Sequence, residues 1–170
     1  PQLYVCNVSE EDILKGNELT KKLEQHFLNE EIKIILISSL IESEISILNS
    51  DDKTVFLKDL GLEETGLSKL IKSGYDLLNL ITFFTSGPKE SKAWTLENGL
   101  TAPNAAGKIH TDFEKGFIRA ETISYKDFFH FNGEQGAKDA GKLRVDGSDY
   151  IVKDGDVFNF RFNVWFCKGV

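Results

Sequence analysis

Three ionisable residues stand close together in the stretch AAGKIHTDFEKGFIRAE, which spans Ala105 to Glu121. His110, Asp112 and Glu114 are of the types that perform general acid–base catalysis. Polar residues at the end of a short helix are, however, usually caps and solvated turn residues, because they satisfy backbone groups that have no partner inside the helix. We therefore predict no catalytic residue here, and expect a short helix to end in His-Thr-Asp before the chain turns through FEKG.

Other side chains that bind metals or activate water form no recognisable pattern. Glu42 and Glu44 are two positions apart, so on a helix they would point to different faces. The residues with zinc-binding side chains lack the spacing of a metal site: His26, His130, Cys6 and Cys167. We predict no metal site. The two cysteines lie near opposite ends of the chain, which is typical of a reduced intracellular protein.

The composition is that of a globular protein whose surface is acidic overall. The net charge is −7 and the pI is about 5.0, which argues against a surface devoted to nucleic acid and leaves a local basic patch possible. We expect no DNA partner. No apolar run is long enough to cross a bilayer, so we expect a cytoplasmic protein with no membrane partner. The chain has no methionine and enters a strand-like run directly after Pro1, which indicates a fragment of a longer protein.

The first half of the chain has the pattern of an α/β protein. LYVCNV and IKIILISS read as strands, and the apolar continuity of the second predicts a parallel strand covered on both faces. Between them, Ser9 with Asp12 three residues later predicts the start of a helix that carries Ile13, Leu19, Leu23 and Phe27. Helical segments IESEISILN and DDKTVFLKDLG follow, and Thr65 is expected to cap a longer helix.

After Leu80 the pattern becomes α+β. ITFFTS and KAWTLE predict a hairpin, Asn98-Gly99 predicts a turn, and Pro103 is expected in the first turn of a helix. Further strands are predicted at FIRAETIS, at KLRV leading through Asp146-Gly147 to YIV, and at VFNFRFNV, where Phe158, Phe160, Phe162 and Val164 alternate with polar residues. This order suits a ubiquitin-like β-grasp, with a domain boundary near Leu80.

Several of these stretches carry a family resemblance. FFTSGPKESKAWTLENGLTAPNAAGKIHTDFEKGFIRAETISYKDF and AGKLRVDGSDYIVKDGDVFNFRFNV resemble the C-terminal TGS domain of the YchF (Obg-like) ATPases, a translation-factor-class branch of the P-loop GTPases. YVCNVSE resembles the base-specificity segment of that family, and ILISSLIESEI resembles the strand and loop after it. The resemblance implies an α/β remnant of a P-loop G domain with a helical segment at 1–80 and an α+β TGS domain at 81–170. The WFCKGV tail runs past the strand where such proteins usually stop.

The resemblance also limits what this chain can do. A P-loop requires the pattern G-x-x-x-x-G-K-[ST], and the sequence has no such stretch. We therefore expect the phosphate-binding and catalytic machinery to lie outside this chain. ATP with Mg²⁺ is the cofactor implied for the intact parent protein, with GTP bound more weakly, and none is expected for the chain alone.

Two sets of site residues follow from the resemblance. Glu10 stands where GTPases of this superfamily have the guanine-reading aspartate, which implies a preference for ATP. The residues implied for the purine base are Asn7, Val8, Glu10, Ser38, Ser39 and Leu40. On spacing alone, Ser9 and Glu10 could equally serve only to cap a helix.

The second set concerns the His-Thr-Asp turn, which the TGS domains of translation and stringent-response proteins share. The resemblance implies a recognition surface for the ribosome or structured RNA at Lys108, His110, Lys115 and Arg119, because cations meet phosphate and histidine can stack on a base. An ordinary charged face remains the alternative for these four. Two other functions stay open: a free-standing β-grasp module that binds protein, and an RNA-binding regulator that ignores nucleotide.

Overall fold

The computed structural model describes residues 1–30, 32–87 and 90–163. The chain divides into two compact units, Pro1–Leu78 and Asn79–Val170, which we call unit 1 and unit 2 and describe separately. The predictions made for Val164, Cys167 and the WFCKGV tail concern residues outside the described ranges. Among the described residues, no helix combines the length and the apolarity that a membrane crossing requires.

Unit 1 contains one pair of strands and four helices among its described residues. Its elements in chain order are β1 (Leu3–Asn7), α1 (Glu18–His26), β2 (Lys33–Ile37), α2 (Ser39–Ser46), α3 (Ser50–Asp59) and α4 (Gly66–Leu77). β1 and β2 run parallel, in register from Leu3 opposite Lys33 to Asn7 opposite Ile37. The prediction of a parallel strand pair is therefore confirmed. Buried aliphatic residues of β2 and α2 form its small core: Ile35, Ile41 and Ile45.

The predicted start of the first helix is wrong. The backbone turns after Ser9, whose hydroxyl donates to Asp12 Oδ2 over 2.9 Å, and α1 begins only at Glu18. Asn17 caps it, since Asn17 Oδ1 accepts from the amides of Leu19 and Thr20. Gly16 before the cap has a φ of 66°. That left-handed conformation breaks any helix started at Ser9. Thr65, by contrast, caps α4 as predicted, because its Oγ1 accepts from the Ser68 amide.

Unit 2 is built around a five-stranded mixed sheet in the order β4-β3-β7-β5-β6. Its elements are β3 (Leu80–Ser86), β4 (Ser91–Glu97), α5 (Ala102–Ile109), α6 (Thr111–Lys115), β5 (Phe117–Ser124), α7 (Tyr125–His130), α8 (Glu134–Asp139), β6 (Arg144–Asp146) and β7 (Asp156–Phe162). β3 pairs with β7 in parallel and with β4 in antiparallel fashion, while β5 is antiparallel to both β6 and β7. The predicted hairpin, the helix with Pro103 in its first turn and the long strands are confirmed.

Two sequence predictions in unit 2 are wrong. The FEKG stretch is no turn, because Thr111–Lys115 forms the short helix α6 and only Gly116 ends it. The segment at YIV is no regular strand, since Ile151 makes a single isolated bridge to Thr101. In addition, α7 and α8 fill a region where no helix was predicted. Each has only six residues, which is too short for a helical period to stand out from the sequence.

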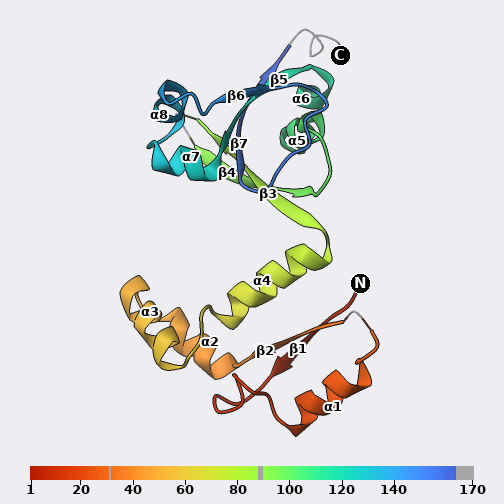
Figure 1. Ribbon diagram of the computed structural model, residues 1–170, viewed down its shortest axis with the longest axis vertical. Helices are drawn as coiled ribbons and strands as arrows, with labels where there is room; N and C mark the ends of the chain where they lie inside the picture. Colours follow the sequence, from red (N-terminus) through yellow and green to blue (C-terminus); the bar gives the residue numbers. More distant parts are fainter. Residues whose placement is uncertain (31, 88–89, 164–170) are drawn as a thin grey trace. The chain divides into compact units, whose positions relative to one another are not determined.

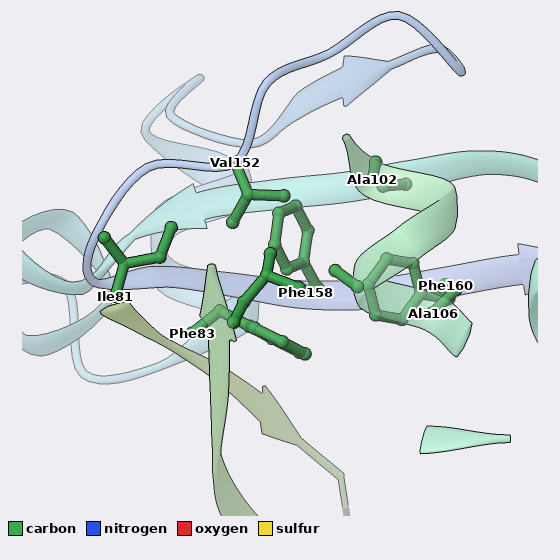
Figure 2. Packing of buried hydrophobic residues seen from close by; sticks show 10 residues of the cluster. Ile81, Phe83, Ala102, Ala106, Val152, Phe158 and Phe160 are labelled. Atoms are coloured by element: carbon green, nitrogen blue, oxygen red, sulfur yellow. The ribbon is translucent and has the colours of Figure 1, made fainter. Parts of the chain in front are cut away.

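The core of unit 2 lies between α5 and one face of the sheet. Figure 2 shows Phe83, Phe158 and Phe160 of the sheet meeting alanines of α5 and Val152 of the last loop. Ala102, Ala105 and Ala106 are fully buried, and their small side chains let the helix approach the sheet closely. Phe158 and Phe160 stack with their ring centroids 4.9 Å apart. α5 and α6 lie on this side of the sheet, and α7 and α8 lie on the other (Figure 1).

Candidate functional site

The predicted base-side residues lie where two neighbouring strands end and lead into a loop at 8–10 and a loop at Ser38 that opens α2. Asn7 ends β1, and Ser38 to Leu40 follow β2. Because the two strands are parallel, both loops leave the same edge of the sheet, which is where α/β proteins bind ligands. They line one open hollow of about 470 Å³, whose wall comprises Asn7, Val8, Ser9, Glu10, Glu11, Ser38, Ser39 and Leu40. The structure thus brings all six predicted base-side residues together.

Hydrogen bonds hold the two loops against each other. Asn7 Oδ1 accepts from both the amide and the hydroxyl of Ser39, each over 3.0 Å. The Val8 amide donates to the Ile37 carbonyl over 2.8 Å, so it is not available to a ligand. The Val8 side chain and Ser38 are buried, whereas Glu10 and Leu40 are exposed at the rim. The shape of the hollow is therefore fixed by Asn7, and its exposed rim offers a carboxylate and an apolar surface.

The lining of the hollow combines amide, hydroxyl, carboxylate and apolar side chains. Among the described residues, no group of three or more His, Cys, Asp and Glu side chains could hold a metal. The hollow also has no glycine-rich backbone loop of the kind that surrounds phosphates.

The His-Thr-Asp segment proves to be a helix cap. His110 Nδ1 accepts from the Asp112 amide over 3.2 Å and lies 3.4 Å from Asp112 Oδ2. The imidazole therefore caps the N-terminus of α6. Glu114 accepts a hydrogen bond from Asn104 Nδ2 over 3.1 Å, which ties α6 to α5. A side chain at Gly107 would collide with Glu114, so the two helices touch at that glycine. The three ionisable residues thus have structural partners.

The four predicted recognition residues do not all share one surface. Lys108 and Lys115 are exposed in the last turns of α5 and α6, with His110 between the helices. Arg119 stands opposite Arg161 in the β5–β7 register, while its neighbour Ala120 points into the core under α5. Because side chains alternate along a strand, Arg119 lies on the face of the sheet that α5 does not cover.

On that other face, Arg161 neutralises a carboxylate. Its guanidinium donates to both oxygens of Glu121, over 3.2 and 2.9 Å. This bond lowers the pKa of Glu121 below its ordinary value, and the nearby charges of Arg119 and Lys138 act in the same direction, while burial opposes them. Arg119 and Arg161 would repel each other as directly opposed like charges, and Glu121 relieves that repulsion.

One polar network escaped the sequence analysis altogether. Asp156, at the start of β7, is 3% exposed and accepts from the Tyr150 hydroxyl over 2.8 Å and from the Lys153 amide over 2.9 Å. Arg144 Nη2 donates to Tyr150 Oη over 3.0 Å. The network ties the loop before β7 to β6. No local sequence pattern specifies these buried partners.

The fold defines a mixed α/β protein with one parallel and one mixed sheet, and its candidate site is an open hollow at a strand edge. A family model for the YchF-GTPase C-terminal region, described as a protein of unknown function (DUF933), matches residues 80–163. The chain is 54% identical over 164 residues to the "Ribosome-binding ATPase YchF" of Haemophilus influenzae and 49% identical over 166 residues to that of Bacillus subtilis. Each match covers 96% of this chain and 45% of the relative.

Solved structures agree with these sequence matches. The YchF GTPase of Schizosaccharomyces pombe superposes with a TM-score of 0.79 at 33% identity, over 94% of this chain and 43% of that one. A GTP-binding protein of Pyrococcus horikoshii shares the fold, with a TM-score of 0.64 at 20% identity, over 96% and 46% of the two chains. The chain belongs to the YchF family, and it spans less than half the length of the relatives it matches.

Proposed function

We propose that this chain supplies the purine-side loops and a TGS recognition domain to a cytoplasmic, ribosome-associated P-loop NTPase that prefers ATP. The observation that carries the proposal is the single hollow formed by the six base-side residues, in a chain about half identical to proteins named ribosome-binding ATPases. Hydrolysis of the nucleotide in the intact protein would change how unit 2 is presented to the ribosome or RNA.

The topology of the two units supports this division. In unit 2 the strand order is β4-β3-β7-β5-β6, and β3 and β7, which are the first and last strands of the unit along the chain, are parallel neighbours. This order matches that of a ubiquitin-like β-grasp. We assign it as the TGS domain. In unit 1, a strand, a helix and a parallel strand with loops at one edge fit the end of a P-loop G domain.

The preference for ATP rests on the rim of the hollow. Guanine presents N1–H and an exocyclic amine, which an aspartate at the position of Glu10 would accept in the family's GTPases. The Val8 carbonyl accepts no hydrogen bond from the described residues, and it is free to accept from the amine of adenine. The carboxylate of Glu10 is exposed at the rim and extends one methylene further than that of aspartate, so we expect it to pair guanine's two donors poorly, at a cost of about 1–3 kcal/mol. We therefore expect ATP to bind about one to two orders of magnitude more tightly than GTP.

The test compares dissociation constants of ATP and GTP in the full-length protein. Equal constants would contradict this role of the hollow. Restoring both elements of the guanine reader, with Val8→Lys and Glu10→Asp together, should shift the preference toward GTP. Glu10→Asp alone should shift it less, because the lysine of the usual motif is also missing.

Recognition by unit 2 rests on the distribution of its charges. Positions 79–170 hold 12 of the 20 Lys and Arg residues and 12 of the 27 Asp and Glu residues, so the net charge of −7 belongs to unit 1. The described lysines of unit 2 form no ion pair. Many of its carboxylates are instead engaged, namely Asp112, Glu114, Glu121, Asp127, Asp139, Asp146, Asp154 and Asp156. We expect the exposed lysines among these to contact phosphate at short range, although the unit as a whole carries no net charge.

Charge reversal tests this recognition in the intact protein. Lys108→Glu with Lys115→Glu alters the α5–α6 side, and Arg119→Glu alters the other face separately. We expect the double variant to weaken ribosome co-sedimentation, more so at low salt, because unscreened charges act over about 10 Å. Lys22→Glu on α1 is the matched control. Unchanged association in both test variants, with the fold intact, would refute the proposal, and binding that ignores ATP would favour a nucleotide-independent RNA-binding regulator.

A further inference from the structure

A row of aromatic rings, one half-buried and two exposed, crosses from the sheet of unit 2 onto α7. Phe84 of β3, Tyr125 and Phe129 form this aromatic row, with ring centroids 5.6 Å apart in the first pair and 6.2 Å apart in the second. Tyr125 is 51% exposed and Phe129 is 74% exposed. The rings of Tyr125 and Phe129 lie only 23° from parallel. Water therefore reaches a set of flat, roughly aligned rings, which is unusual for side chains of this size.

The row is held rigidly by its backbone. Ser124 caps α7, with its Oγ accepting from the Asp127 amide over 3.2 Å and donating to the Asp127 carboxylate over 2.7 Å. The Tyr125 amide donates to the Gly155 carbonyl over 2.8 Å, which fixes the start of the helix to the loop before β7. Rings fixed in this way lose little freedom when a flat ligand stacks on them.

The charges around the row are suited to a polyanion. Lys126 and His130 are exposed on the same short helix, and Lys153 is exposed in the loop that contacts Tyr125. The neighbouring carboxylates are engaged, because Asp127 accepts from the Ser124 hydroxyl and Asp154 accepts from the Thr82 amide. The large exposed apolar side chains of α7 are both aromatic. Flat rings beside free cations match the bases and phosphates of a nucleic acid better than the aliphatic surface of a protein.

We propose that the aromatic row binds single-stranded RNA by stacking on unpaired bases. Bases in a duplex are already stacked and cannot lie on such rings. The row lies on the side of the sheet opposite α5 and α6, so it is a second contact besides the cations of Lys108 and Lys115 (Figure 1). This proposal rests on the proposed RNA partner of unit 2, and the binding requires no nucleotide in unit 1.

The experiment measures fluorescence anisotropy of a labelled adenosine RNA of about 12 nucleotides with this 170-residue chain, a length within the range that such sites cover. We expect Phe129→Ala to weaken binding about tenfold, as loss of one base-stacking contact does. Phe129→Tyr should bind like the wild type because it keeps the ring. Phe129→Leu should bind as weakly as Phe129→Ala, since it keeps only the apolar surface.

Controls separate this site from folding and from the proposed ribosome contact. Val145→Ala removes another exposed apolar side chain of unit 2 and should leave binding unchanged. The unfolding temperature of each variant should match the wild type, because Phe129 is mostly exposed. Equal binding by Phe129→Leu and wild type, equal affinity for the annealed duplex, or no binding of the single strand would each overturn the proposal. None of these outcomes would contradict the separate proposal that Lys108 and Lys115 contact the ribosome.

Discussion

Gly66 begins α4 at a point where no side chain fits. Its amide donates to Glu42 Oε1 of α2, and a Cβ at this position would lie 2.8 Å from Ile37 Cγ2 and 3.0 Å from that carboxylate oxygen. Ile37 ends β2, and Glu42 is one turn into the helix that follows the base-side loop. A single glycine thus joins α4 to the elements that hold the hollow.

Gly66→Ala should therefore destabilise unit 1 by about 1–3 kcal/mol, the usual cost of forcing atoms into a packed site. Gly74→Ala on the same helix is the matched control, because a Cβ there meets nothing within 4 Å. It should stabilise by about 0.5–1 kcal/mol, since alanine favours a helix interior. Urea unfolding gives both free energies, and a destabilisation of equal size in the two variants would contradict the steric explanation.

The buried network at Asp156 predicts an alkaline transition. Burial, and then the hydrogen bond to Asp156, raises the pKa of Tyr150 from 10.0 to about 12. A raised pKa means that this stabilisation is complete below pH 10 and is lost as the pH rises through about 12. Tyr150→Phe removes the hydroxyl and leaves Asp156 with fewer donors, so it should cost about 1–3 kcal/mol near neutral pH.

Absorbance titration of tyrosinate checks this directly. The protein has four tyrosines, and the tyrosinate titration step at the highest pH should be absent from Tyr150→Phe. The wild type should also lose more stability than the variant as the pH rises above 10. Parallel stability curves for the two proteins would show that Tyr150 is not the group concerned.

At the scale of elements, mutation can distinguish the two residues that were candidates for the cap of α1, Asn17 and Ser9. Asn17→Ala should lower the stability of α1 by about 1 kcal/mol, because two helix amides lose their acceptor. Ser9→Ala should have almost no effect on α1, since Ser9 bonds only to Asp12 within the preceding turn. Amide hydrogen exchange of Leu19 and Thr20 measures this locally. Faster exchange in Ser9→Ala than in Asn17→Ala would reinstate Ser9 as the cap.

At the scale of the whole molecule, the two units differ in how well they cover their apolar residues. Among the residues that the structure describes, ten of the fifteen exposed large hydrophobic residues lie in unit 1, including Ile47 at 85% and Leu28 at 79% exposed, and α3 contains no buried residue. Unit 2 has a continuous aromatic core under α5. We therefore expect unit 1 to unfold at lower urea concentration than unit 2. Loss of amide protection at the same urea concentration in β2 and β7 would contradict this order.

Nucleotide affinity is also a property of the whole protein. The hollow that we propose for the base has no P-loop amides to bind phosphates, and phosphate contacts dominate the affinity of such sites. We expect residues 1–170 to show no submicromolar binding of ATP in calorimetry, while the full-length protein binds. Tight binding by this chain alone would show that the loops recognise more than the base.

The sequence by itself determined the elements whose signals are local or long. The apolar run at β2 predicted a parallel strand, Thr65 predicted the cap of α4, and the alternating phenylalanines predicted β7, because each pattern reflects which face is buried. Motif resemblance also placed Asn7 and Ser39 in one site before any contact was known.

Only the tertiary structure decided which of these residues act together. Alternation along β5 placed Arg119 on the face opposite α5, and Gly16 moved the helix start from Ser9 to Asn17. The bonds of Tyr150 to Asp156 and of Gly66 to Glu42 join residues whose partners the local sequence does not specify. Such contacts depend on strand register and on how closely elements pack. These are set by burial over the whole unit, which no short stretch of sequence encodes.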